Sequence, residues 1–367
     1  MKRRQLVQGA AALGALSVAA CSSSNSPSQS QSPSSNERFR WKMVTTWPKD
    51  FPGMGTGANR LAERITRMSG GRLTVTVYGA NELVPPFEAF DAVASGTAEM
   101  AHSAAYYWKG KAQAAQFFGG VPFGMSAIEL NGWLYYGGGL ALWEEVYAPF
   151  GVLPFPAGNT GVQMGGWFNR EINSVDDLRG LKMRIPGLGG EVLQKVGGLA
   201  VNIPGAEIFT ALKTGTIDAT EWVGPWNDLS FGLHQAAKYY YTPGWHEPGT
   251  PLECIVNAQA FAALPEDLQE IVRVACQAIY LDMYAEYTLR NQDALRSLVD
   301  EHGVELKTFP TEVIEVLRTA SEEVISGIAA QDEMSARVYD SYRAFLDKAR
   351  WWTANSEQTY LRLRTPA

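Results

Sequence analysis

Two segments of this 367-residue chain repeat one local pattern, and this repeat constrains the fold more than any other feature. Residues 94–99 read Ala-Ser-Gly-Thr-Ala-Glu, and residues 213–218 read Lys-Thr-Gly-Thr-Ile-Asp. Each places a glycine where a helix is expected to end, because glycine readily adopts the left-handed conformation that closes many helices. The repeat predicts two similar α/β lobes. The alternative is that unrelated α/β segments share this capping chemistry.

Hydrophobic periodicity extends both units into alternating strands and helices. In the first half we expect strands at 41–47, 73–77 and 100–104 and helices at 57–68 and 87–94. In the second half we expect strands at 181–185, 200–203 and 216–219 and helices at 191–196 and 206–214. Apolar stripes then predict a helical C-terminal third, with helices over 265–301 and 311–349. Such a stripe is usually a core seam, but it can also cross between lobes or pack against a second subunit.

The first twenty residues predict an export signal. Three cationic residues at 2–4 precede an uncharged, alanine-rich run at 9–20, which is too short to span a membrane. Small residues lead to Cys21, as in a bacterial lipoprotein, and a Ser/Pro/Gln/Asn-rich stretch follows. We therefore expect a signal peptide at 1–20, exported by the general or the twin-arginine route, and a lipid-anchored flexible tether at 21–37. Ordinary secretion, with Cys21 incidental, is the alternative.

Composition and missing motifs exclude several functions. The net charge of −7 disfavours a nucleic-acid partner. The sequence lacks a nucleophile elbow, a zinc-protease helix, a Cys-x-x-Cys pair and a phosphate-binding loop, so we expect no enzyme. Four scattered histidines, His102, His234, His246 and His302, each suit a structural role better than that of a base or a ligand. Cys254 and Cys276 can pair in an oxidising compartment but are too few for a disulfide framework.

Polar residues in and just before the second lobe do suggest binding chemistry. Arg184 lies within an apolar strand and needs a partner, because a guanidinium group cannot lose its charge. An arginine binds a carboxylate through two parallel hydrogen bonds, whereas two glutamates and a glutamine oxygen suit sodium or calcium better than zinc. The set comprises Asn159, Gln163, Arg184, Glu221, Trp222 and Glu247. The alternative is that Arg184 pairs with a structural carboxylate and that the glutamates are solvated.

From about Arg38 onward, the chain resembles the solute-binding subunits of tripartite ATP-independent periplasmic (TRAP) transporters. The motifs that carry the resemblance lie at 45–48, 95–100, 158–167, 181–184 and 215–222. Within that family the chain looks most like the branch that binds 2-oxo monocarboxylates such as pyruvate together with a metal ion. Residues 184–186 keep the Arg-x-Pro pattern of the wider family, where several relatives of this branch have glycine. Lactate, a C4-dicarboxylate and a branched 2-oxo acid therefore remain alternatives, as does an exported enzyme on this scaffold.

The resemblance implies an α/β fold of the two-lobed periplasmic-binding-protein type, with a helical C-terminal third and a long helix bridging the lobes. It assigns 38–157 to lobe I, 158–250 to lobe II and 251–367 to a C-terminal region that returns across both lobes. It also implies a periplasmic or extracytoplasmic protein that delivers its ligand to the membrane subunits of the transporter. A homodimer through the C-terminal helices is compatible with the family.

The resemblance also assigns roles to residues of the proposed site. Arg184 would bind the substrate carboxylate, and Asn159 and Trp222 would contact the substrate. His102 and Ser103, at the end of a first-lobe strand, would line the opposite wall. The metal ligands would be Gln163, Glu221, the backbone carbonyl of Trp222 and Glu247, with sodium expected rather than calcium. Trp222, Trp226 and Trp245 would enclose a short apolar tail of the substrate.

Overall fold

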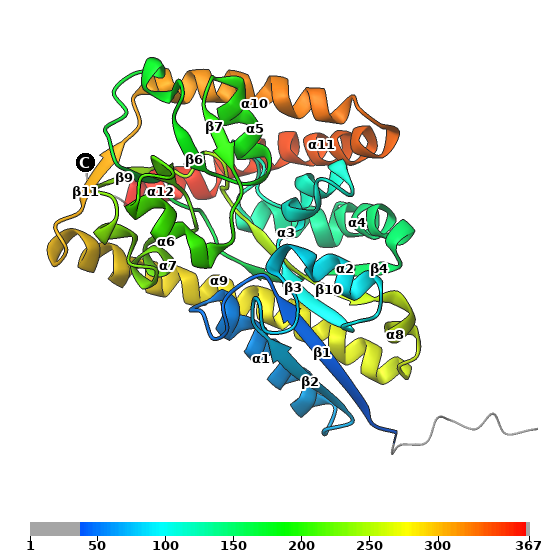
Figure 1. Ribbon diagram of the computed structural model, residues 1–367. Helices are drawn as coiled ribbons and strands as arrows, with labels where there is room; N and C mark the ends of the chain where they lie inside the picture. Colours follow the sequence, from blue (N-terminus) through cyan, green and yellow to red (C-terminus); the bar gives the residue numbers. More distant parts are fainter. Residues whose placement is uncertain (1–36, 365–367) are drawn as a thin grey trace, which may run out of the picture. The chain divides into compact units, whose positions relative to one another are not determined.

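Two β-sheets organise the part of the chain that the computed structural model describes, residues 37–364 (Figure 1). The first sheet has five strands in the order β2-β1-β3-β10-β4, and the second has six in the order β11-β9-β5-β8-β6-β7. The predicted signal peptide, lipidated Cys21 and nearly all of the tether at 21–37 lie outside the described residues.

The first sheet is mixed and carries lobe I. Its strand β1 (Phe39–Thr45) runs parallel to β2 (Leu73–Tyr78) and β3 (Met100–Ser103), while β10 (Pro251–Asn257) runs antiparallel to both β3 and β4 (Val152–Asn159). The helical segments of this half are α1 (Met54–Met68), η1 (Pro86–Glu88), α2 (Ala89–Ala94), η2 (Ala105–Trp108), η3 (Gln113–Phe118), α3 (Ala127–Tyr136), α4 (Gly139–Tyr147) and η4 (Ala148–Phe150).

Strand β10 differs from the sequence expectation, which placed residues 251–257 in the C-terminal helical region. Six of its seven residues are buried, Glu253 included, so this run lacks the alternation of buried and exposed positions that marks a half-buried strand. Such a run cannot be separated from a helix start by periodicity. Cys254 of this strand and Cys276 are both buried free thiols in the structure.

The second sheet carries lobe II. Its strands are β5 (Gly166–Phe168), β6 (Lys182–Arg184), β7 (Leu199–Val201), β8 (Ala219–Thr220), β9 (Tyr239–Thr242) and β11 (Glu305–Thr308). Its helical segments are η5 (Val175–Leu178), α5 (Gly187–Lys195), α6 (Gly205–Lys213), α7 (Pro225–Ser230) and η6 (Leu233–Gln235). Both glycines of the sequence repeat adopt the left-handed conformation, with φ of 75° at Gly96 and 73° at Gly215. Each closes a helix that leads into an inner strand, β3 or β8, and the prediction of two α/β lobes is confirmed.

The remaining segments form the helical C-terminal third, as predicted: α8 (Ala258–Ala262), α9 (Glu266–Asp300), α10 (Thr311–Ala329), α11 (Glu333–Asn355) and α12 (Glu357–Arg364). With 35 residues, α9 is roughly 52 Å long and contacts both lobes, pairing with Arg60 of α1 through Asp282 and with Asn227 of α7 through Tyr287. The single helix expected over 311–349 is two helices, because Asp332 caps a new one by accepting a hydrogen bond from the Ser335 N–H. Among residues 37–364, no helix combines the length and apolar character that a membrane span requires.

Glu253 of β10 is a fully buried carboxylate within lobe I. It accepts hydrogen bonds from the Trp108 indole and, at 2.9 Å, from the Tyr147 hydroxyl. Burial raises the pKa of Glu253 to about 7 in spite of these bonds. The folded state therefore keeps a proton that the unfolded chain loses above pH of about 4.5, and its free energy of unfolding falls as the pH rises from about 4.5 to 7.

We expect Glu253→Gln to remove this pH dependence, because a glutamine mimics the neutral acid. The free energy of unfolding of the variant, relative to wild type, should rise by roughly 3 kcal/mol between pH of about 4.5 and 8. Urea unfolding at both pH values measures the difference. Glu207→Gln, at an exposed position of α6, is the control and should show no such change. Parallel pH profiles for wild type and Glu253→Gln would contradict the assignment.

Candidate ligand and metal site

Besides the bridging helix α9, two connections carry the chain between the two sheets, and they lie side by side. One joins β4 to β5 over residues 160–165, and the other joins β9 to β10 over residues 243–250. Their backbones are bonded to each other: the Gln163 N–H donates to the Glu247 carbonyl at 3.2 Å, and the Thr160 N–H donates to the Thr250 carbonyl at 3.1 Å. Polar side chains on these connections therefore meet at the junction of the lobes.

Arg184 is the last residue of β6 and lies 1% exposed at the carboxyl end of an inner strand. Its Nη1 donates to the Glu221 carboxylate and, at 3.1 Å, to the Glu221 carbonyl, while Nη2 lies 3.4 Å from the Tyr107 hydroxyl. The Trp222 ring covers the guanidinium group, with 5.0 Å between Cζ and the ring centroid. One Nη2 hydrogen finds no acceptor within residues 37–364, so the group can still bind an anion.

A second cluster joins Glu221, His246 and Glu247, which offer ligand atoms within 4.8 Å of one another, and all three are buried. Gln163 donates its Nε2 hydrogen to Glu247 Oε2 at 2.7 Å, but its own Oε1 is buried and has no partner among the described residues. A buried acceptor without a partner costs free energy unless something occupies it. Two carboxylates beside an orphaned amide oxygen fit a hard cation, so the residues present suit the predicted metal ion.

Electrostatics within this cluster also favour a cation. Burial and the nearby Glu221 carboxylate raise the pKa of Glu247 to about 7. The His246 Nε2 lies 3.3 Å from Glu221 Oε2, and its Nδ1 has no partner among the described residues. Among the described residues, Arg184 is the one permanent cation hydrogen-bonded to Glu221. A bound metal ion would therefore relieve the remaining repulsion between the two carboxylates.

His102 and Ser103 are already engaged within lobe I. The His102 Nδ1 accepts a hydrogen bond from the Trp47 indole at 2.9 Å, and its Nε2 lies 2.9 Å from the Ala157 carbonyl. Burial lowers the pKa of His102 to about 4, so the ring is neutral and has no nitrogen left for a ligand. Ser103 accepts from the Thr46 hydroxyl at 3.3 Å. Their predicted place in the ligand wall stays a prediction, and any contact from His102 would be apolar.

Asn159 and Trp222 are buried near the same junction. Asn159 ends β4, donates to the Tyr280 hydroxyl of α9 at 2.8 Å and accepts from the Gly161 N–H at 2.7 Å. It thus ties the first connection to the bridging helix and retains one amide hydrogen. The Trp222 Nε1 is buried without a partner among residues 37–364, and the ring also contacts Phe51 of lobe I at a centroid distance of 6.2 Å.

Comparison with known proteins decides what kind of protein carries this site. The family described as bacterial extracellular solute-binding protein, family 7, matches residues 43–332. This chain belongs to that family. Its members include the solute-binding proteins of TRAP transporters, so the resemblance seen in the sequence is confirmed. The family consists of binding proteins for transport, which agrees with the expectation of no enzyme.

Similar binding proteins have been named for their ligands or solved with them. A Nostoc protein named monocarboxylate 2-oxoacid-binding periplasmic protein all3028 is 42% identical over 98% of both chains. The protein from Colwellia psychrerythraea, solved with calcium and pyruvate, is 47% identical, with a TM-score of 0.86 over 89% of this chain and 99% of that one. The protein from Pseudoalteromonas atlantica, solved with sodium and pyruvate, is 46% identical, with a TM-score of 0.87 over the same shares. These likenesses confirm the two-lobed fold with its C-terminal helices.

The structure of this solute-binding protein adds residues that sequence reasoning missed. Tyr106 and Tyr107 of η2 bring lobe I to Arg184, and burial raises the pKa of Tyr107, which keeps its hydroxyl neutral. His246 joins the acidic cluster, and Thr250 donates to Glu247 Oε2 at 2.6 Å. A usable signal was the run Tyr106-Tyr107-Trp108 directly after a predicted strand, where ligand sites of α/β proteins often lie. Trp245 packs on His246, at a centroid distance of 5.4 Å, while Trp226 packs on Tyr287 of α9.

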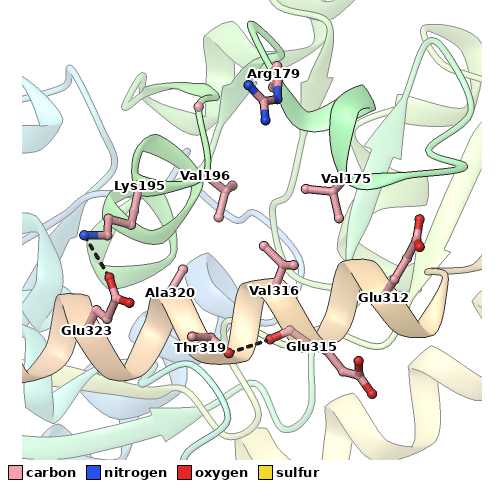
Figure 2. Close-up of a pocket in the computed structure, with 11 residues that line it drawn as sticks. Val175, Arg179, Lys195, Val196, Glu312, Glu315, Val316, Thr319, Ala320 and Glu323 are labelled. Atoms are coloured by element: carbon pink, nitrogen blue, oxygen red, sulfur yellow. Dashed lines mark hydrogen bonds and ion pairs between the residues drawn. The ribbon is translucent and has the colours of Figure 1, made fainter.

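A hollow on the surface of lobe II is separate from the site around Arg184 (Figure 2). It has a volume of about 660 Å³ and lies between α10 and the segment from η5 to α5. Figure 2 shows Val175, Val196 and Val316 facing across it, with Lys195 paired to Glu323 at 2.8 Å. None of the residues that line this hollow belongs to the site around Arg184. The hollow is therefore not part of the proposed ligand site.

Proposed function

We propose that this TRAP solute-binding protein captures a small 2-oxo monocarboxylate such as pyruvate together with a metal ion and passes it to the membrane subunits of the transporter. The observation that carries the proposal is the buried Arg184–Glu221 pair beside Glu247 and the orphaned Gln163 Oε1. The solved relatives that bind pyruvate with calcium or sodium support it.

Five of the predicted residues have a defined task in this function. The free Nη2 hydrogen of Arg184 would bind the substrate carboxylate, and Gln163, Glu221, the Trp222 carbonyl and Glu247 would hold the ion. When bound, the ion supplies a positive charge that a carboxylate oxygen and the neighbouring keto oxygen can coordinate. Two ionised glutamates, one arginine and one monocarboxylate sum to a net charge of −2, which sodium reduces to −1 and calcium to zero. Either ion makes burial of the substrate anion less costly.

Titration calorimetry on chelator-treated protein tests the proposal. Pyruvate should bind tightly with sodium or calcium present and much more weakly without an ion. L-lactate, which has a hydroxyl in place of the keto oxygen, and succinate should bind more weakly than pyruvate under the same conditions. Stronger binding of either acid, or pyruvate affinity that does not depend on any ion, would refute the proposed function.

A branched 2-oxo acid is the second candidate substrate. A cavity of about 110 Å³ lies directly beside the end of β6 that carries Arg184. Its lining joins apolar side chains such as Ile185 and Val201 to the polar ones of Lys109, Gln194 and Asn202. The apolar part can receive an aliphatic tail longer than a methyl group. Including 2-oxoisovalerate in the same titrations separates the candidates, because it should exceed pyruvate in affinity only if this cavity belongs to the substrate site.

For the resident ion we propose sodium. Two of the four proposed ligands, the Gln163 amide oxygen and the Trp222 carbonyl, are neutral, and sodium accompanies pyruvate in the similar protein from Pseudoalteromonas atlantica. Elemental analysis of the purified protein, followed by exchange against each ion, measures the preference. Stoichiometric calcium that sodium cannot replace would contradict this choice.

We further propose that the protein is held at a membrane through lipidated Cys21 and that it forms a homodimer through its C-terminal helices. Large apolar side chains at the end of α11 and in α12 are exposed, with Trp351 72%, Trp352 64% and Leu363 81% accessible. Intact mass of the full chain purified from membranes tests the lipid, and light scattering over a range of concentrations tests the dimer. An unmodified N-terminus, or the mass of a monomer throughout, would overturn the respective proposal.

A further inference from the structure

Gly120 lies against the proposed metal ligand Glu247. It is a buried residue of lobe I, in the connection between η3 and α3. A Cβ atom placed on Gly120 would lie 2.9 Å from Glu247 Cδ and 3.0 Å from its Cβ, and closer still to its Cγ. Real Cβ atoms essentially never approach other heavy atoms so closely. Any side chain at position 120 would therefore have to displace Glu247.

The backbone at this position does not itself require glycine. Gly120 is absent from the glycines with positive φ, so alanine can adopt its conformation without strain. What the glycine provides is space. Filling that space would displace Glu247 or the backbone that carries residue 120, and either shift changes how the two fit together.

Glu247 has little freedom to move away. Its side chain is 3% exposed, and its Oε2 accepts hydrogen bonds from Gln163 Nε2 at 2.7 Å and from Thr250 Oγ1 at 2.6 Å. Its backbone carbonyl accepts from the Gln163 N–H at 3.2 Å. The carboxylate is thus held by the two connections between the lobes on one side and by the backbone of lobe I on the other.

The segment that carries Gly120 is itself held against the connection at 243–250. Three residues further on, the Phe123 N–H donates to the Trp245 carbonyl at 2.8 Å, and the two rings stack at a centroid distance of 6.0 Å and an interplanar angle of 28°. Trp245 lies two residues before Glu247 on the connection from β9 to β10. Lobe I therefore reaches the metal ligand through two neighbouring contacts.

We propose that Gly120 is a positioning residue. Because it has no side chain, it leaves the space that Glu247 occupies, and lobe I thereby fixes where this carboxylate meets the ion. The inference rests on the proposed function, because it requires Glu247 to bind a metal. It follows that ion binding needs the contact between lobe I and the connection at 243–250, which couples the ion to the arrangement of the lobes.

The test is the affinity for calcium ions, titrated into chelator-treated protein with and without pyruvate. Gly120→Ala should weaken calcium binding by about 10-fold to 100-fold, the range typical of residues that orient metal ligands. Gly110→Ala is the matched control, because a Cβ there meets no atom within 4 Å, its φ is not positive and it also belongs to lobe I. The control should bind calcium as the wild type does.

A double-variant cycle separates positioning from a general packing defect. Glu247→Ala lacks the Cγ and the carboxylate that alanine at position 120 would strike. Alone it should weaken calcium binding, and adding Gly120→Ala to it should cost little further affinity. Wild-type affinity in Gly120→Ala, or losses that simply multiply in the double variant, would overturn the inference. Failure of the wild type to bind any ion would instead refute the proposed function, and the inference with it.

Discussion

Arg184→Met will abolish pyruvate binding and leave calcium binding intact or tighter. Methionine keeps most of the length of the arginine and fills the same buried space, but it has no charge and no N–H donor. The substitution removes one partner of the proposed pair between the guanidinium group and the pyruvate carboxylate. Removing one partner of a buried, hydrogen-bonded charge pair costs about 2–5 kcal/mol. This corresponds to a loss of pyruvate affinity of roughly 30-fold to several thousand-fold. Calcium binding is expected to persist because Glu221 and Glu247 remain and the guanidinium group no longer competes for Glu221.

The same substitution will lower the stability of the protein without ligands. Glu221 loses its Arg184 partner while staying 1% exposed, and an unpaired buried charge of this kind costs about 3–5 kcal/mol. Calcium should restore much of the lost melting temperature by replacing the missing charge. Arg179→Met, at a 73% exposed arginine of the same lobe, is the control and should change neither property. Pyruvate affinity close to that of the wild type would remove Arg184 from the substrate site.

Local chemistry explains which parts of the fold could be predicted. The lobes were visible because Gly96 and Gly215 need positive φ, and this requirement leaves a trace in the sequence. The start of α5 was expected at residue 191 but lies at Gly187, because the run Gly-Leu-Gly-Gly has poor helix propensity and only tertiary packing makes it helical. Strand β10 was missed because both of its faces are buried.

The residues of the candidate site also differ in whether the local sequence reveals them or only tertiary packing brings them to the site. Arg184, Glu221 and Glu247 could be singled out because each is a charged residue in an apolar or proline-bounded setting. Gly120 could not, because it reaches the site only through packing of lobe I against lobe II and has no side chain that requires a partner. Tyr107 had only a weak signal, its place after a predicted strand. His246 was judged alone as structural, although its position next to Glu247 was a signal that it shares the same environment.

Glu221→Gln will weaken calcium and pyruvate binding together. Glutamine keeps the shape of the side chain and an oxygen that can accept from Arg184, so the fold should persist. However, the site loses one of its two carboxylates. Residues that only orient a metal ligand typically contribute about 10-fold to 100-fold in affinity. Because Glu221 is itself a proposed ligand, we expect calcium affinity to fall by about 100-fold or more. Glu312→Gln, at an exposed position of α10, is the control and should bind both ligands as the wild type does.

The decisive measurement is how the loss of calcium affinity and the loss of pyruvate affinity depend on each other. If one ion and one substrate share this cluster, calcium should raise the pyruvate affinity of the wild type strongly and that of Glu221→Gln little, because the variant no longer holds the ion at the substrate. Arg184→Met should show the opposite pattern, with the ion retained and the substrate lost. Independent losses in Glu221→Gln, with pyruvate binding unchanged while calcium binding disappears, would mean that the ion stabilises the protein without taking part in substrate recognition.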